Sequence, residues 1–329
     1  MVYNFPVARV FRACQSNTEG DGVMGTPLER AAASVFMIVL GYALKRAGFF
    51  SKGDADAVAK LCLNITLPAA IITGFGSYKQ DFSLFAVIAL GAVCNAVVIG
   101  VSWFLSVRSS RRDKIFHMFA LPGYQIGTFT LPYIGGALGP YGILVTCMFD
   151  MGNALFACGG TYALVSAMPS LGGGARPTMR EFVKRVFSTV PFVVYVVALL
   201  WVSFIGGVPR CMVALAEPVG AANTFAAMFM IGLMIEIKTK GAELWTVFST
   251  LAVRYAASAA LALLFYFYTP FPLVTRQILA LVVFSPVSAL CPIFTEKCGG
   301  DTGMAGFAGS ISIVISVVAM TAVMAAMGI

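Results

Sequence analysis

Charged residues are scarce in this chain. Of its 329 residues only 11% are Asp, Glu, Lys or Arg, whereas 59% are hydrophobic and the mean hydropathy is +0.89. A soluble core of this length does not need so much apolar sequence, so the composition argues against an ordinary soluble protein and predicts an all-α integral membrane protein. The formal net charge is +8. Because the positive residues cluster in short loops between apolar runs, we interpret them as topology signals and expect no nucleic-acid partner.

Several chemical signatures are missing as well. The chain has one histidine, His117, and therefore no HExxH pair, and its eight cysteines form no CxxC motif. Buried thiols without such spacing are typical of small hydrophobic residues, so neither a metal site nor a disulfide is expected. A Walker-type phosphate loop is also absent, which argues against direct use of ATP. We predict no catalytic residue, no metal and no cofactor other than a possible coupling H+ or Na+.

Runs of about 20 apolar residues are long enough to cross a bilayer as helices. The hydropathy pattern predicts ten such helices, at 30–48, 57–76, 83–106, 116–138, 141–167, 187–207, 212–236, 244–268, 274–298 and 303–327. Lys and Arg gather in alternate loops, most densely at Arg108, Arg111, Arg112 and Lys114. The positive-inside rule puts these loops in the cytoplasm, so both termini are expected outside a cell (plasma or inner) membrane.

The helices divide into two sets of five. Residues 1–29 form a polar tail, 30–167 the first five-helix repeat, 168–186 a cytoplasmic linker with an amphipathic segment, and 187–329 the second repeat. An offset of about 160 residues brings Pro132 onto Pro292 and Gly139 onto Gly299. Since five is odd, the second set enters the membrane from the opposite side, which makes a 5+5 inverted repeat.

Two of the predicted helices are interrupted. Leu121–Pro132 contains Pro122 and Pro132, and Phe284–Pro292 contains Pro286 and Pro292. Proline removes a backbone donor and clashes with the preceding turn, so each helix should break. Broken backbone cannot face lipid, and two breaks in corresponding places indicate the crossed broken helices of a secondary transporter.

Several segments resemble the auxin efflux carrier family, in its bacterial branch. They are Leu40–Phe50, Leu61–Pro68, Tyr124–Pro132, Asp150–Asn153 and Cys298–Asp301. The resemblance implies ten helices, the crossed fold shared with sodium/proton antiporters and bile acid symporters, and transport of small carboxylates. This chain has Gln125 where the family has asparagine, and Thr130 where it has glycine.

Candidate site residues follow from the breaks. Helix ends at the breaks expose N–H groups that attract anions, and nearby side chains add hydrogen bonds. The predicted substrate-binding residues are Gln125, Gly127, Thr128, Thr130, Pro132, Ser285, Pro286, Ser288, Pro292, Asn64 and Asn223. Each polar one could instead only satisfy broken backbone.

Ionisable and amide groups inside the apolar runs give further candidates. An ionisable residue within a bilayer is a functional hypothesis by default, so Asp150 and its neighbour Asn153 are coupling-ion candidates for H+ or Na+. The alternative is that Asp150 only holds the break in shape. Asn95 is expected to bridge helices. Arg254 is expected to extend to the cytoplasmic face, with an anion-binding role left open.

Three functions fit these patterns unequally. We expect a secondary transporter of small mono- or dicarboxylates that works by alternating access. A membrane sensor that binds a metabolite without moving it has the same sequence signature. An integral membrane enzyme is disfavoured, because one histidine and one deeply placed aspartate supply little catalytic machinery. A homodimer in the lipid bilayer is possible.

Overall fold

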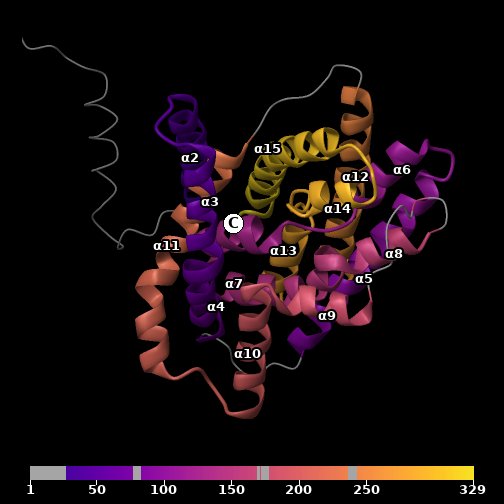
Figure 1. The fold of residues 1–329 in the computed structure, drawn as a ribbon. Coiled ribbons are helices and arrows are strands. Elements are labelled where there is room, and N and C mark those ends of the chain that lie inside the picture. Colours follow the sequence, from indigo (N-terminus) through magenta and orange to yellow (C-terminus); the bar gives the residue numbers. More distant parts are fainter. Residues whose placement is uncertain (1–26, 77–82, 169–170, 172–177, 236–242) are drawn as a thin grey trace, which may run out of the picture.

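A computed structural model describes residues 27–76, 83–168, 171, 178–235 and 243–329 (Figure 1). The polar tail 1–29 therefore falls largely outside the described residues, whereas of the linker 168–186 only 169–170 and 172–177 do. Within the described ranges every regular element is a helix, and extended pairing is limited to one isolated bridge.

The first half of the chain contains α2 to α8. In order they are α2 (Pro27–Arg46), α3 (Lys52–Leu61), α4 (Leu67–Gly76), α5 (Ser83–Leu105), α6 (Arg111–Ala120), α7 (Leu131–Leu155) and α8 (Thr161–Ala167). Wide π-helical turns at Cys62–Thr66, Ile126–Thr130 and Phe156–Gly160 join some of them. Two of these turns end just before Pro68 and Pro132, whose rings would clash with the carbonyl four residues back, and a wider turn relieves that clash.

The second half contains α9 to α15. They are α9 (Met179–Phe187), α10 (Val190–Phe204), α11 (Arg210–Met234), α12 (Leu244–Tyr268), α13 (Leu273–Val282), α14 (Cys291–Lys297) and α15 (Thr302–Met327). Six helical segments of the described chain are long and apolar enough to cross a membrane, or seven if α9 and α10, bent by 81°, form one span. One of the six, Ile126–Ala167, is interrupted at Gly139, whose φ of +68° is not helical. The protein is thus an all-helical protein with the spans of a multi-pass membrane protein.

The helices pack as two bundles (Figure 1). In the first bundle α11 lies along α2 and α4, and α10 packs on α4. The second bundle contains α5 to α8 and α12 to α15, with α7 against α5, α12 against α13, and α14 against α15. Helix α7 also contacts α2, α4, α10 and α11, so it joins the two bundles.

Glycines set the closest helix contacts inside each bundle. A Cβ on Gly232 of α11 would lie 2.1 Å from the carbonyl oxygen of Ile38 in α2. A Cβ on Gly152 of α7 would lie 2.0 Å from the carbonyl oxygen of Ile88 in α5. Small residues that let helix backbones touch are typical of packing within membranes. Each bundle is therefore held by at least one contact that tolerates no side chain.

Candidate functional site

The two predicted breaks meet in space. The first separates α6 from the turn that begins at Ile126, and the second separates α13 from α14. Between them Tyr124 and Val287 form an antiparallel bridge, and the Gln125 N–H donates to the carbonyl of Pro286 at 3.1 Å. Gly123 makes the sharp turn with φ +78°, a conformation that favours glycine. We call residues 121–125 and 283–290 together the crossing.

Arg254 is the central cation of the crossing. Its guanidinium donates to Ala120 (3.1 Å), Leu121, Gly123 (3.0 Å), Ser285 (3.0 Å) and Pro286 (3.1 Å), all backbone carbonyls. The residue is 2% exposed, so the expectation that it extends to the cytoplasmic face is wrong. The carbonyls at the ends of α6 and α13 have no helical partners and form the negative end of each helix dipole. A buried cation donates hydrogen bonds to these carbonyls and also offsets the negative dipole ends.

Two asparagines replace missing backbone partners in the first break. Asn153 of α7 donates to the carbonyl of Tyr124 at 2.9 Å and accepts from the Tyr124 N–H at 3.1 Å, as a paired strand would. Asn95 of α5 donates to the Asn153 amide oxygen at 3.2 Å and accepts from the Gly123 N–H at 2.9 Å. Asn95 thus bridges helices as expected, while Asn153 holds the shape of the break.

Asp150 lies beside this pair and is 8% exposed. Its carboxylate accepts from the Asn153 amide at 2.9 Å and from the Tyr195 hydroxyl at 3.0 Å. Asp150 Oδ2 is 3.6 Å from where a Cβ on Gly127 would stand. Tyr195 belongs to α10 in the first bundle, so this hydrogen bond connects the bundles. Sequence reasoning missed Tyr195, because a tyrosine in an apolar run gives no sign of its partner.

Hydroxyl groups from the two breaks also touch. Thr130 Oγ1 and Ser285 Oγ are 2.6 Å apart, and both are fully buried. Thr130 donates in addition toward the Gln125 carbonyl at 3.3 Å, and the Gln125 side-chain amide donates to Thr128 at 3.0 Å. The structure therefore brings Gln125, Thr128, Thr130 and Ser285 together at one point.

The other predicted residues are more dispersed. Ser288 accepts from the Leu290 N–H at 3.3 Å, and its Cβ is 3.4 Å from where a Cβ on Gly123 would stand. Pro292 lies in the first turn of α14. Asn64 is not brought to the crossing: its side chain is exposed and donates to the Lys60 carbonyl of its own helix at 2.9 Å. Asn223 is buried and accepts from Thr66 at 2.9 Å.

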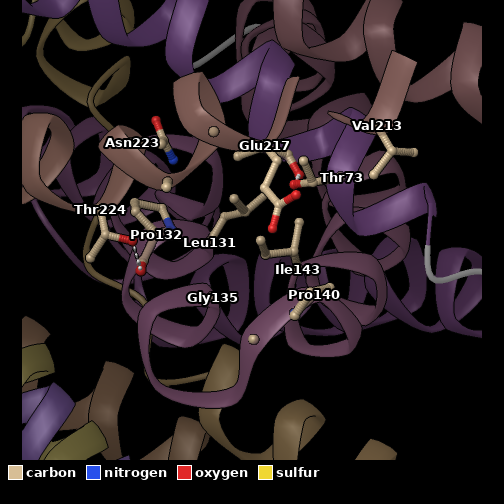
Figure 2. Close-up of a pocket in the computed structure, with 14 residues that line it drawn as sticks. Thr73, Leu131, Pro132, Gly135, Pro140, Ile143, Val213, Glu217, Asn223 and Thr224 are labelled. Atoms are coloured by element: carbon tan, nitrogen blue, oxygen red, sulfur yellow. Dashed lines mark hydrogen bonds between the residues drawn. The ribbon is translucent and has the colours of Figure 1, made fainter. Parts of the chain in front are cut away.

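A cavity of about 260 Å³ lies between α4, α7 and α11, next to the first break (Figure 2). Pro132 and Asn223 line it, and Thr224 donates to the Pro132 carbonyl at 3.3 Å. Thr73 and Glu217 also line it. Sequence reasoning overlooked Glu217, although a carboxylate within the apolar α11 was a visible signal.

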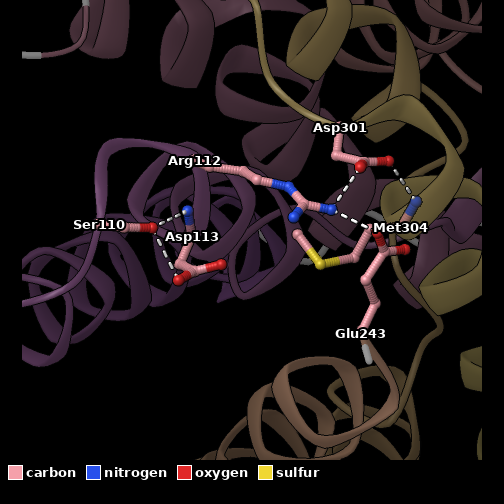
Figure 3. A network of polar contacts seen from close by, with 6 residues as sticks. All are labelled: Ser110, Arg112, Asp113, Glu243, Asp301 and Met304. Atoms are coloured by element: carbon pink, nitrogen blue, oxygen red, sulfur yellow. Dashed lines mark hydrogen bonds and ion pairs between the residues drawn. The ribbon is translucent and has the colours of Figure 1, made fainter. Parts of the chain in front are cut away.

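Aromatic rings and an ion-pair network lie near the start of α14. Phe294 packs on Phe119 and Tyr162, with ring centroids 5.9 and 5.3 Å apart. Beyond them Arg112 of α6 pairs with Glu243, which precedes α12, and with Asp301, which caps α15, each at 2.5 Å (Figure 3). The Met304 N–H and then Arg112 lower the pKa of Asp301. This network ties three helix starts of the second bundle together.

Comparisons with protein-family models and with curated proteins find no match to this chain. Its class therefore rests on the fold: long apolar helices compatible with a membrane protein such as a transporter. Within the described ranges no group of three or more His, Cys, Asp or Glu side chains is placed to hold a metal ion.

Proposed function

We propose that this protein is a secondary transporter of small organic anions, of the mono- or dicarboxylate class. The observation that carries the proposal is the crossing, where two broken helices meet beside a cavity. Irregular backbone at membrane depth occurs where it is buried in protein or lines a watery cavity, and paired breaks are typical of transporter binding sites. The resemblance to the auxin efflux carrier family is part of this proposal.

The described helices support a ten-span arrangement. Nine of the predicted segments overlap α2, α3–α4, α5, α6–α7, α10, α11, α12, α13–α14 and α15. The tenth overlaps the stretch of α7 beyond Gly139 together with α8, because Gly139 ends the preceding helix and Pro140 begins a new one. Under this reading each set of five contains one broken helix as its fourth member. That correspondence favours the 5+5 inverted repeat in a cell membrane, with both termini outside.

An anion is the expected cargo because a helical turn starts at the crossing. The turn at Ile126 begins there, and N–H groups at helix starts attract negative charge. The Thr130 and Ser285 hydroxyls can donate to a carboxylate once the hydrogen bond between them breaks. Arg254 does not serve as the anion ligand in this state, because its Nη atoms are occupied by backbone carbonyls.

Alternating access has a structural basis in the one-sided cavity. The cavity is lined by Pro140 and Val213, which lie near the loops that carry few positive charges, and the positive-inside rule puts that end outside. The other side is filled by aromatic rings and by the Arg112 network. The molecule would then be in an outward-facing state.

Uptake into proteoliposomes tests the proposal. Purified protein is reconstituted, and radiolabelled mono- and dicarboxylates are offered with sodium and proton gradients imposed separately. Saturable flux driven by one gradient is expected, and Asp150→Asn should abolish the gradient dependence because Asp150 is the buried carboxylate next to the first break. Binding without flux would instead favour a membrane sensor. The absence of both binding and flux would refute the proposal.

A further inference from the structure

The cavity between α4, α7 and α11 has an unbalanced charge. Its lining residues include one carboxylate, Glu217, and no Lys, Arg or His. The remaining polar lining side chains are Thr73, Asn223 and Thr224, which are neutral. Figure 2 shows the Glu217 side chain reaching from α11 into the cavity, beside Thr73 and toward Ile143.

Glu217 lies in the N-terminal part of α11, and its side chain is exposed. It is seven residues from the start of α11 and is flanked by apolar sequence and by Pro218. A charged side chain in such a segment is costly, and it is normally retained where it faces a watery path for substrate or ions. No described salt bridge neutralises Glu217, and the exposed side chain is one of the residues that line the cavity. A ligand in this cavity therefore meets a negative charge that nothing else in the lining offsets.

A purely anionic ligand would be repelled by that charge, whereas a positive group would be held by it. We propose that the cavity binds the ammonium group of a small zwitterionic substrate, with Glu217 as its counter-ion and Thr73 as a neighbouring acceptor. This inference rests on the proposed transport function and narrows the proposed carboxylates to those that also carry an ammonium group. The carboxylate of such a substrate would face the crossing while its ammonium group faces Glu217. A cavity of about 260 Å³ is smaller than sites for drug-sized ligands, which suits a molecule of amino-acid size.

The test compares amino compounds with their des-amino partners on the full-length protein in detergent. The probes are alanine and propionate, 4-aminobutyrate and butyrate, and glutamate and glutarate, each titrated while thermal unfolding is followed. In at least one pair the amino compound should bind roughly tenfold more tightly, a ratio that one well-placed charge pair can supply. Glu217→Gln should bring that ratio to about one, and the control Glu296→Gln, at an exposed position on α14, should leave it unchanged.

Four outcomes overturn the inference. They are equal binding within every pair, a ratio that survives Glu217→Gln, no binding of any probe, and stabilisation by sodium chloride alone that Glu217→Gln removes. The last would assign Glu217 to an inorganic cation. Flux is measured separately with the same probes. Amino-selective binding without flux would refute the transport proposal and leave the inference standing. Flux of the des-amino anions alone would support the transport proposal and refute the inference.

Discussion

Replacing Arg254 with methionine should destabilise the protein more than any other single loss of charge in the second bundle. The guanidinium donates to five backbone carbonyls from both breaks and is 2% exposed. Methionine fills much of the same volume without donors. The carbonyls at the ends of α6 and α13 would then lack partners in a place that water reaches poorly.

The magnitude follows from opposing terms. A hydrogen bond to a charged group contributes about 1.5–3 kcal/mol, so five of them form a large gross term. Burial of the guanidinium costs several kcal/mol, which the substitution relieves. We expect a net loss of about 3–5 kcal/mol in the free energy of unfolding, comparable to breaking other buried charged contacts. At roughly 2 °C per kcal/mol this lowers the unfolding temperature by about 6–10 °C.

The assay is intrinsic-fluorescence thermal unfolding of purified protein, combined with hydrogen exchange of peptides that cover the crossing. Arg276→Met is the matched control, because Arg276 is half-buried and has one hydrogen bond described, to the Tyr266 carbonyl at 2.9 Å. The control should lose about 1 kcal/mol. Arg254→Lys should fall between, since an ammonium group has three donors. Equal unfolding temperatures for the two methionine variants, with exchange at 121–125 and 283–290 unchanged, would refute the reasoning.

Three further outcomes are expected. Gly152→Ala should prevent α5 and α7 from packing, because its Cβ would lie 2.0 Å from a carbonyl oxygen, and should strongly reduce the yield of folded protein in size-exclusion chromatography. The control Gly309→Ala, whose Cβ meets open space, should behave as wild type in the same assay. Asn153→Leu removes both hydrogen bonds to Tyr124 and should cost about 2–3 kcal/mol in thermal unfolding, and a smaller effect than Gly309→Ala would contradict its structural role. The pKa of Asp301 is lowered in the folded state, so its stabilising contribution is full above the unfolded value near 4 and is lost as pH falls through the folded pKa. Asp301→Asn should accordingly flatten the loss of stability below about pH 4 in a pH series of unfolding temperatures.

Features that depend on local chemistry could be predicted from the sequence. Proline removes a donor wherever it stands, so Pro132 and Pro292 mark breaks, and the helices do break on their N-terminal sides. Gly139 and Pro140 likewise separate two helices that are otherwise one apolar run. The corresponding places of the two breaks predict that they lie together, and Tyr124 and Val287 form a bridge between them.

Features that depend on which face of a helix turns inward could not be predicted. Asn64 and Asn223 both interrupt apolar runs, yet one side chain is exposed and the other is 2% exposed. A span that is apolar all round carries no periodic signal to separate its lipid face from its buried face. The same ambiguity hid the inward direction of Arg254 and the part played by Tyr195. Glu217 was a signal of another kind, a charge in an apolar run, and position alone identifies it.

The distribution of polar contacts bears on how the molecule could move. Within the second bundle the crossing is held by the hydrogen bonds from Arg254 to backbone carbonyls, by the Thr130–Ser285 contact and by the hydrogen bonds between Asn153 and Tyr124. Between the bundles the described hydrogen bonds are isolated ones: Tyr195 donates to Asp150, Thr224 donates to the Pro132 carbonyl, and Arg30 of α2 donates to the Ala137 carbonyl at 3.5 Å. Breaking such isolated bonds costs less than breaking the five hydrogen bonds of the buried Arg254 guanidinium. If the protein transports, the crossing should therefore travel as one rigid body against the first bundle, and Tyr195 must release Asp150 each time it does.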